Sequence, residues 1–378
     1  MYLFHDVRRA KRNRRLFAQE FAQPLTLFDD RQMITMSDVA QRAGVSLSTV
    51  SHFLNRTRPL SEKTRQAVLD AIEATGFLDH RLESAVSTAI AVGVVLPSVA
   101  SPYFSELIDG LGGEAFRRGV DLLIMTTSED SDHEYRAVDA LLSRHVEGIV
   151  LIPTTGWTTR TRPLLRRKET PVVLVDRMGA DNWDQVGCEN ESSSEALTGH
   201  LMSQGHTRIG YIRGLAGLST TVEREQGFRK AHQRHGIPLA ENYIVEGLSS
   251  VRGGRLATEQ LLLMENPPTA IYCSNNNMSI GLLTAFRQHN VRVKKDIALV
   301  AFDDLEWSDI VSPGITSMAQ PFHAMGSKAL QLMLERLDKP ALTPRVIRLP
   351  PSFEHRESCG CLDNDGIDAD RPFTLRTQ

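Results

Sequence analysis

Polar side chains that could hold a small, hydroxyl-rich ligand stand where apolar runs of the sequence end. Asp176 and Arg177 follow PVVLV, Asn275 follows TAIYCS, and Asp303 and Asp304 follow DIALVAF. Asn190 belongs to the same group of strand-end residues. Carboxylates, amides and guanidinium groups can accept and donate several hydrogen bonds at once. Each of these residues could separately be a helix cap or a turn residue. Together they predict a cleft that binds several hydroxyl groups.

No catalytic pattern accompanies these residues, although aspartates at strand ends can act as general bases. The sequence lacks a phosphate-binding Gly-rich loop followed by Lys and Ser/Thr, a nucleophile elbow, and a His/Cys spacing suited to a catalytic metal. We therefore expect a binding protein without a cofactor, and not an enzyme.

The four cysteines, Cys188, Cys273, Cys359 and Cys361, are too few and too unevenly spaced for a disulfide-stapled secreted fold. This usage is typical of a reducing cytoplasm. The pair Cys359 and Cys361 could belong to a metal or redox site, but the sequence offers no partners at ligand spacing. We expect residues 359–378 to form a disordered tail, and we predict no metal site.

Beyond residue 88, short apolar runs alternate with amphipathic helical segments, as expected for a parallel sheet covered by helices on both faces. The runs AIAVGVVLP, VDLLIMTT, GIVLIP and PVVLVDR are followed by a second series, RIGYIRG, TAIYCSN and DIALVAFDD. The restart indicates two similar α/β lobes. Since open parallel sheets bind ligands at the carboxyl ends of their strands, the cleft between the lobes is the predicted ligand site.

A compact helical pattern precedes this domain. Thr35 and Asp38 form a capping box, Gly44 ends the first helix, and Ser46 caps a second helix through about Asn55. A third helix begins after Ser61 and ends at Gly76. The first two helices share an apolar face across a tight turn, made of Val39, Ala40, Ala43, Val45, Val50 and Phe53. This is a helix-turn-helix pattern. Ordinary core helices of a larger domain are the alternative, but the tight Ala-Gly-Val turn and the small polar residues that open the second helix favour DNA binding.

In a helix-turn-helix module the second helix enters the major groove of DNA. Leu47, Ser48, Thr49 and His52 are the side chains predicted to reach base edges. Residues better placed for phosphates are Thr35, Asn55, Arg56 and Arg58. For each of them the alternative is a solvated surface side chain.

Composition agrees with this organisation. The 378 residues are 41% hydrophobic and 24% charged, with a formal net charge of -3, so at least two ordinary globular domains are expected. The basic opening segment lacks the apolar stretch of a signal peptide, and no later run reaches the roughly 18 apolar residues of a membrane span. Because Met33 lies just before the first patterned helix, residues 1–32 are either a phosphate-binding arm or upstream sequence, and we assign them no function.

TMSDVAQRAGVSLSTVSHFLN resembles the helix-turn-helix signature of the LacI/GalR repressor family, and SPYFSEL, PVVLVDR, GHTRIGYI, REQGFRKA and FDDLEW follow in that family's order. The resemblance covers residues 33 to about 358. It implies an all-α three-helix DNA-binding domain (33–78), a hinge (79–89) and a two-lobed α/β domain resembling periplasmic sugar-binding proteins (90–358), which binds effector and dimerises.

The resemblance also implies a cytoplasmic homodimer whose paired heads bind a near-palindromic operator, with Val86 at the position of a hinge side chain that enters the minor groove. Members commonly have leucine there, whereas this chain reads RLESAV. Tyr103, Phe104 and Arg224 match effector contacts, as do Asn275 and Asp303. Asn276 replaces a more usual acidic residue.

We therefore expect a transcription regulator, a repressor of a carbohydrate-utilisation operon, whose operator affinity is controlled by a small polar effector. A sugar acid is conceivable because Arg177 and Arg224 could both face the cleft, but a neutral sugar or a nucleobase would suit the same polar lining. The sign of the response and further assembly into tetramers are open. A transport binding protein would share the large domain, but the helical module and the absence of an export signal argue against it.

Overall fold

The computed structural model describes residues 35–55, 60–75, 77, 90–179, 182–304 and 307–361, without the side chains of residues 54, 55 and 62. Contacts divide the chain into two units, residues 1–88 and 89–378. Predictions for residues 1–32, for the hinge at 79–89 with Val86, for Arg56 and Arg58, and for most of the tail lie outside the described residues.

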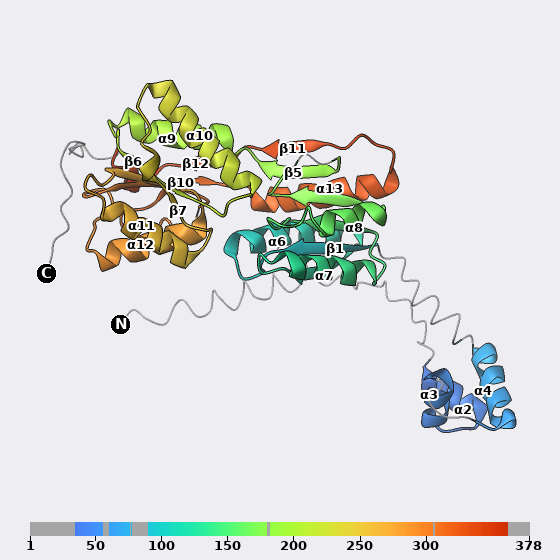
Figure 1. Cartoon of the computed structure of the whole chain (residues 1–378). Coiled ribbons are helices and arrows are strands. Elements are labelled where there is room, and N and C mark those ends of the chain that lie inside the picture. Colours follow the sequence, from blue (N-terminus) through green and yellow to red (C-terminus); the bar gives the residue numbers. More distant parts are fainter. Residues whose placement is uncertain are drawn as a thin grey trace, which may run out of the picture. The chain divides into compact units, whose positions relative to one another are not determined.

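The first unit contains three helices, α2 (Met36–Ala43), α3 (Leu47–Asn55) and α4 (Glu62–Thr75), labelled in Figure 1. The predicted caps are present. Thr35 and Asp38 form the capping box of α2, and Gly44, with φ 66°, ends that helix in the left-handed conformation. The hydroxyl group of Ser46 accepts a hydrogen bond from the amide of Thr49 at the start of α3. These local signals fix where the helices begin and end.

One small core holds the three helices together. Its fully buried members are Val39, Ala40, Val50, Val68, Ala71, Ile72 and Phe77, with Ala43, Val45 and Phe53 packed against them. The helix-turn-helix face predicted from the sequence is therefore the face that the structure buries. Phe77, which follows the third helix, is an additional core residue that the periodicity did not indicate.

The second unit contains two six-stranded sheets, each in its own lobe. The first lobe has strand order β11-β5-β4-β3-β1-β2 with all strand pairs parallel. Its elements are β1 (Ala91–Leu96), α6 (Pro102–Arg118), β2 (Asp121–Thr126), α7 (Ser131–Leu142), β3 (Gly148–Leu151), α8 (Thr161–Arg167), β4 (Val172–Val175), β5 (Asp184–Cys188), α13 (Phe322–Asp338) and β11 (Val346–Leu349).

The second lobe has strand order β12-β10-β9-β8-β6-β7, in which only β12 runs antiparallel to its neighbour. Its elements are α9 (Glu191–Ser203), β6 (Ile209–Arg213), α10 (Ser219–His235), η1 (Glu241–Tyr243), β7 (Ile244–Glu246), α11 (Val251–Leu262), β8 (Ala270–Cys273), α12 (Asn276–Gln288), β9 (Ala298–Phe302), β10 (Thr316–Ala319), β12 (Ser352–Glu354) and η2 (Glu357–Cys359).

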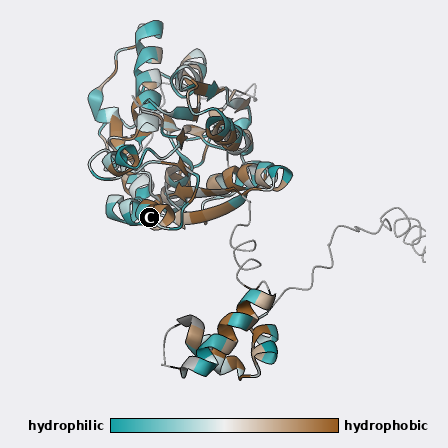
Figure 2. Cartoon of the chain, turned by 90° about the vertical axis from the view of Figure 1, so that its right-hand side faces the viewer, coloured by the Kyte–Doolittle hydropathy of each residue, from teal (hydrophilic) through white to brown (hydrophobic). Residues whose placement is uncertain are grey.

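Each sheet is buried on both faces because neighbouring residues of a strand point to opposite sides. In the first lobe Val94 belongs to the core under α6 and α13, whereas Val95 belongs to the core under α7 and α8. In the second lobe Ile212 and Tyr211 divide in the same way between the α11/α12 core and the α9/α10 core. Figure 2 shows hydrophobic segments along interior strands. The predicted pair of α/β lobes is confirmed.

The chain crosses between the lobes three times, after β5, β10 and β11. Figure 1 shows the late elements α13 and β11, in red, in the same lobe as the early element β1. At the contact of α13 with α6, a Cβ atom on Gly110 would lie 2.0 Å from the carbonyl oxygen of His323, so this close approach requires glycine. Dividing the sequence into two consecutive halves would wrongly assign α13 and β11 to the second lobe.

Two further observations bear on the sequence predictions. No helix among the described residues is long and apolar enough to cross a membrane. Residues 359–361 belong to the packed second lobe rather than to a disordered tail, because Cys359 is fully buried in the α9/α10 core and Cys361 packs against it. The boundary predicted at residue 359 is therefore too early.

Candidate functional sites

The outer surface of α3 begins with three side chains predicted to meet base edges. Leu47 and Ser48 are exposed, Leu47 with 51% of its surface accessible, and Thr49 is half-buried. The hydroxyl group of Ser46 lies 2.8 Å from both the Ser48 and the Thr49 hydroxyl oxygens. An exposed leucine beside small hydroxyl side chains can contact a thymine methyl group and neighbouring base edges.

The opposite side of α3 holds the helix in place. Val50 is completely buried and Phe53 packs on the same core, which leaves His52 half-buried between the two faces. Thr35 is committed locally, because both its amide and its hydroxyl group donate to Asp38 at 2.6 and 2.7 Å. A phosphate contact from Thr35 would compete with this capping box. The side chain of Asn55 lies outside the described set.

In the large domain, a pocket between the lobes brings together six of the eight side chains predicted to bind an effector. The pocket is lined by Tyr103, Asp176, Arg177, Gly214, Leu218, Thr220, Thr221, Arg224, Ser249, Ser274, Asn275, Asp303, Gln320 and Phe322. The predicted residues Phe104 and Asn190 are not among them. Both lobes contribute side chains, so a ligand in the pocket would contact both.

Asp176 and Asp303 occupy corresponding positions in the two lobes, directly after β4 and β9. Both have a left-handed backbone, with φ of 63° and 72°. This conformation is uncommon for residues other than glycine, but aspartate tolerates it better than most. At both positions the backbone turns away from the strand direction, which places the carboxylate group at the pocket. Strained backbone that recurs at two equivalent ligand-facing positions is typical of functional sites.

Arg177 is held by acceptors from its own lobe. It donates to the two carboxylate oxygens of Glu129 at 2.7 and 2.5 Å and to the carbonyl oxygen of Pro153 at 3.0 Å. Its Nε lies 3.8 Å from the Asp176 carboxylate. The charge of Arg177 is therefore balanced by Glu129, a residue that the sequence analysis did not identify.

Arg224 interacts with several polar groups around the pocket. It donates to Asn190 Oδ1 at 2.8 Å and to the Ser274 carbonyl oxygen at 2.7 Å, and its Nη2 lies 3.8 Å from Asp303 Oδ1. Its guanidinium group lies 3.8 Å from the centre of the Phe302 ring. Asn190 is fully buried and acts by orienting Arg224.

The side chains of Tyr103 and Phe104, in the first turn of α6, point in different directions. Tyr103 lines the pocket, but Phe104 is only 1% exposed and packs in the core below α6. Consecutive helical residues point about 100° apart, so both cannot face the same cavity. Of this pair, the structure brings only Tyr103 to the pocket, contrary to the prediction for Phe104.

Gln320, Thr220 and Thr221 are pocket residues that the sequence analysis missed. Gln320 follows β10, so the strand-end argument that identified Asp303 would also have found it. Its Nε2 donates to Asp303 at 2.6 Å, whereas its buried Oε1 accepts no hydrogen bond from the described residues. Because buried polar atoms are normally paired, Oε1 is suited to accept a hydrogen bond from a ligand.

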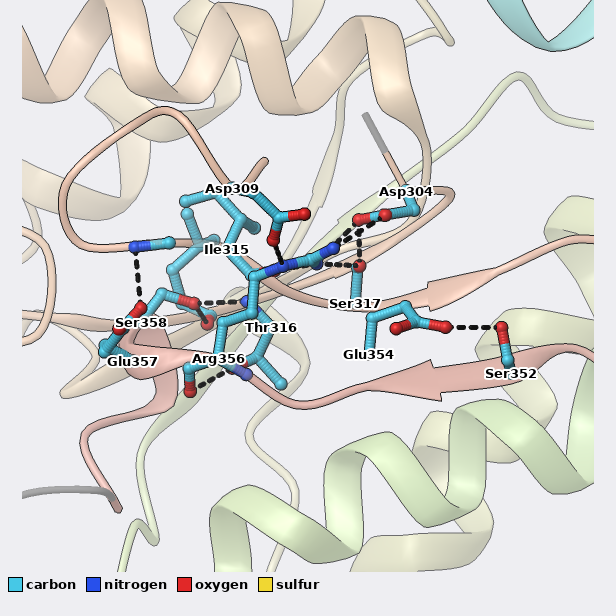
Figure 3. A network of polar contacts seen from close by, with 12 residues as sticks. Asp304, Asp309, Ile315, Thr316, Ser317, Ser352, Glu354, Arg356, Glu357 and Ser358 are labelled. Atoms are coloured by element: carbon cyan, nitrogen blue, oxygen red, sulfur yellow. Dashed lines mark hydrogen bonds and ion pairs between the residues drawn. The ribbon is translucent and has the colours of Figure 1, made fainter. Parts of the chain in front are cut away.

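Asn275, which also lines the pocket, and the neighbouring Asn276 and Asp304 support the structure around it. Asn275 caps α12 through Oδ1, which accepts from the Met278 amide at 3.0 Å. The amide of Asn276 donates to Asp303 at 3.2 Å, while its side chain is buried outside the pocket lining. Asp304 turns to Arg356, which binds its two carboxylate oxygens at 2.8 and 2.9 Å, as Figure 3 shows.

Burial changes the ionisation of two pocket groups. It raises the pKa of Asp176 from 3.8 to about 6, even though Arg177 and Arg224 act in the opposite direction. It also raises the pKa of the Tyr103 hydroxyl group to about 12, so Tyr103 stays neutral and can donate a hydrogen bond. At neutral pH the pocket holds a carboxylate that is poorly solvated, and a ligand that donates hydrogen bonds would stabilise it.

Comparisons with known proteins match both units of the chain. Residues 35–79 match the family model described as bacterial regulatory proteins, lacI family, and residues 198–359 match the periplasmic binding protein-like domain. The chain is 30% identical over 330 residues to the HTH-type transcriptional repressor PurR of Mannheimia succiniciproducens, covering 86% of this chain and 98% of that protein.

Solved structures give the same result. A lac repressor dimer bound to operator has a TM-score of 0.67 and 25% identity, and a complex of the transcriptional regulator CelR with cellobiose has a TM-score of 0.65 and 26% identity. Each alignment covers 86% of this chain and 99% of the other chain.

Proposed function

Because the chain belongs to the LacI family of bacterial DNA-binding transcription regulators, we propose that its interlobe pocket binds a neutral, hydroxyl-rich effector of the sugar class. The observation that carries this proposal is a polar pocket built from both lobes in which both arginines already have carboxylate neighbours. The operator is bound by the helix-turn-helix unit through the exposed start of α3.

Neutrality follows from the pairing of the charged residues. Arg177 is matched by Glu129 and lies close to Asp176, while Arg224 lies close to Asp303. A carboxylate ligand would have to compete with these acceptors and would approach Asp176 and Asp303. A neutral hydroxyl group can instead donate to either aspartate and accept from either arginine. We therefore favour a neutral sugar over the sugar acid that two cleft-facing arginines alone would suggest.

The aromatic lining favours a sugar over a nucleobase. Tyr103 and Phe322 line the pocket with ring centres 5.2 Å apart, and both belong to the first lobe. The second lobe contributes mostly hydroxyl, amide and charged side chains, including Thr220, Thr221 and Ser249. Among the described lining residues, the second lobe contributes no aromatic ring that could sandwich a flat base against Tyr103 and Phe322. One apolar platform opposite many polar groups suits the amphipathic faces of a sugar ring.

One solved relative supports the sugar class. The CelR structure contains cellobiose, whereas a nucleobase, which would suit the same polar lining, is the competing hypothesis. The pocket chemistry favours the sugar. A repressor that responds to a sugar would control a carbohydrate-utilisation operon.

The pocket also indicates how binding would reach the DNA. A ligand that contacts Tyr103 and Asp176 in the first lobe and Arg224 and Asn275 in the second stabilises one relative orientation of the lobes. A coupling free energy of about 1–3 kcal/mol between effector binding and operator binding changes operator affinity about 5- to 150-fold. The three crossing segments are the points at which such a change occurs.

We further propose that the regulator acts as a homodimer through the edge of the first lobe. β2 is the edge strand of its sheet, Ile124 on it is 37% exposed, and the neighbouring Phe116 on α6 is 91% exposed. An unpaired parallel edge beside an exposed aromatic side chain is suited to bury itself against a second copy. A dimer formed in this way carries two helix-turn-helix units, which suits a near-palindromic operator.

The test is isothermal titration of the full-length chain with neutral sugars, sugar acids and purine bases. Arg224→Met is compared with Arg229→Met, a control on the same helix that removes an exposed pairing with Glu241. We expect a neutral sugar to bind the native protein and the control, and to bind Arg224→Met at least about tenfold more weakly. Binding of sugar acids alone would refute the charge argument, and binding of purines alone would refute the platform argument.

A further inference from the structure

Four metal-binding side chains gather in the second lobe, outside both sites described above. They are His200 on α9, His355 just after β12, Cys359 in η2, and Cys361. One ligand atom from each residue lies within 4.8 Å of the other three. The two cysteines therefore do have partners, and these come from positions 161 and 6 residues away from Cys361. The separation of 161 residues hides His200 from any argument based on spacing, whereas His355 could have been found from the sequence.

The donor atoms are close enough to share one ion. Nε2 of His355 lies 2.6 Å from Cys361 Sγ and 3.4 Å from Cys359 Sγ, and the two sulfur atoms are 3.0 Å apart. Nε2 of His200 lies 3.6 Å from Cys361 Sγ. A tetrahedral zinc ion, with Zn–S of about 2.3 Å and Zn–N of about 2.0–2.1 Å, separates its ligands by roughly 3.3–3.8 Å. Small side-chain adjustments would bring the four atoms to that geometry.

The backbone around the two cysteines is firmly positioned. Arg356 is bound to Asp304, and the Ser358 hydroxyl group donates to the Leu299 carbonyl oxygen at 2.6 Å and accepts from the Thr316 amide at 2.8 Å. Figure 3 shows Arg356 extending between Asp304 and Asp309. Gly360 has φ 85°, a left-handed turn that brings Cys361 back beside Cys359.

The two imidazole rings are also held in place. The His200 and His355 rings meet edge to face with centres 5.2 Å apart, and Phe353 packs against both at 5.3 and 5.7 Å. This packing orients both Nε2 atoms toward the sulfur atoms, and none of these residues is among those that line the interlobe pocket. The donors are therefore arranged before an ion binds, which reduces the ordering cost of binding.

We propose that His200, His355, Cys359 and Cys361 form a closed Cys2His2 zinc site that fastens the segment after β12 to α9. Two thiolates balance the charge of a divalent ion, which suits a site where Cys359 is fully buried. Mixed sulfur and imidazole donors select zinc over magnesium or calcium, which prefer oxygen. All four coordination positions are filled by protein, so the site is structural rather than catalytic.

A disulfide between Cys359 and Cys361 is the competing chemistry. It would join two residues separated only by Gly360 and would leave unexplained why two imidazole nitrogens converge on the same sulfur atoms. The two possibilities differ in an easily measured quantity. The zinc site keeps all four cysteine thiols of the chain reduced, whereas the disulfide consumes two of them.

The experiment uses the untagged full-length protein, stripped with a chelator, reloaded with Zn²⁺ or Co²⁺, and freed of excess metal. We expect about one zinc ion per chain, the intense visible absorption of tetrahedral thiolate-bound cobalt, and four thiols titrated after denaturation without reductant. Cys361→Ser and His355→Gln should each lose most of the retained metal. Since His355 is exposed, its variant tests the site even if Cys361→Ser folds poorly.

Two matched variants serve as controls. Cys188→Ala and His235→Gln remove the same kinds of side chain from outside the cluster and should retain one zinc ion. No retained zinc in the native chain, an octahedral cobalt spectrum, or only two titratable thiols would each overturn the proposal. Full zinc retention by both Cys361→Ser and His355→Gln would overturn it as well.

Discussion

Replacing Asp176 with asparagine should make the protein more stable and less able to bind its effector. Asp176 is almost completely buried, and burial raises its pKa from 3.8 to about 6. That difference, at ~1.36 kcal/mol per pKa unit, means that ionised Asp176 costs about 3 kcal/mol of folding free energy in the ligand-free protein. Asparagine has nearly the same shape, tolerates the φ of 63° at this position, and carries no charge.

The pH dependence has a definite sign. Because the folded-state pKa is higher than the unfolded-state pKa, the relative contribution of Asp176 to stability is fully present below pH 3.8 and is lost as the pH rises to about 6. The native protein and Asp176→Asn should therefore be equally stable near pH 4. Their difference should grow through this window to about 3 kcal/mol in favour of the variant, and stay constant at neutral pH.

Urea denaturation at a series of pH values between 4 and 8 measures this difference directly. Asp109→Asn, a change at a side chain that is 81% exposed, is the control and should stay within about 0.5 kcal/mol of the native protein throughout. An Asp176→Asn variant that is less stable at pH 7, or that differs from the native protein equally at every pH, would refute the burial argument.

Four further changes test other parts of the account. Gly227→Ala would place a Cβ atom 2.2 Å from the Glu191 carbonyl oxygen and should lower stability by about 1–3 kcal/mol, measured by thermal unfolding; an unchanged Tm would contradict the packing of α9 on α10. Val50→Ala removes core volume from the three-helix unit and should weaken operator binding while effector titration stays unchanged. Ser48→Ala should alter operator sequence preference more than affinity for random DNA, compared by binding competition. Phe116→Asp should shift sedimentation toward monomer, and an unaltered dimer would exclude the proposed edge.

Local signals in the sequence predicted the helical unit well. The Thr35–Asp38 capping box, Gly44 and the apolar spacing through Val50 all depend on residues a few positions apart, and the structure contains each of them. The alternation of apolar runs likewise predicted two parallel sheets. The return of α13 and β11 to the first lobe was not predictable in this way, because it depends on contacts with segments more than 200 residues earlier.

The pocket was partly predictable for the same reason. Parallel strands end at one edge of a sheet, so Asp176 and Asp303 could be placed there from their positions alone. Phe104 was misplaced because its neighbour Tyr103 takes the pocket-facing direction. Glu129 was missed because only the folded chain brings it to Arg177, a residue 48 positions away.

The most direct test of the central claim is fluorescence anisotropy with the purified full-length protein at one fixed salt concentration, comparing candidate operator DNA with random DNA, with and without the neutral sugar that binds in calorimetry. We predict a clear preference for one near-palindromic duplex and a change in that affinity of about 5- to 150-fold when the sugar is added. Equal binding to operator and random DNA, or an operator affinity that stays constant while the sugar is bound, would contradict the account.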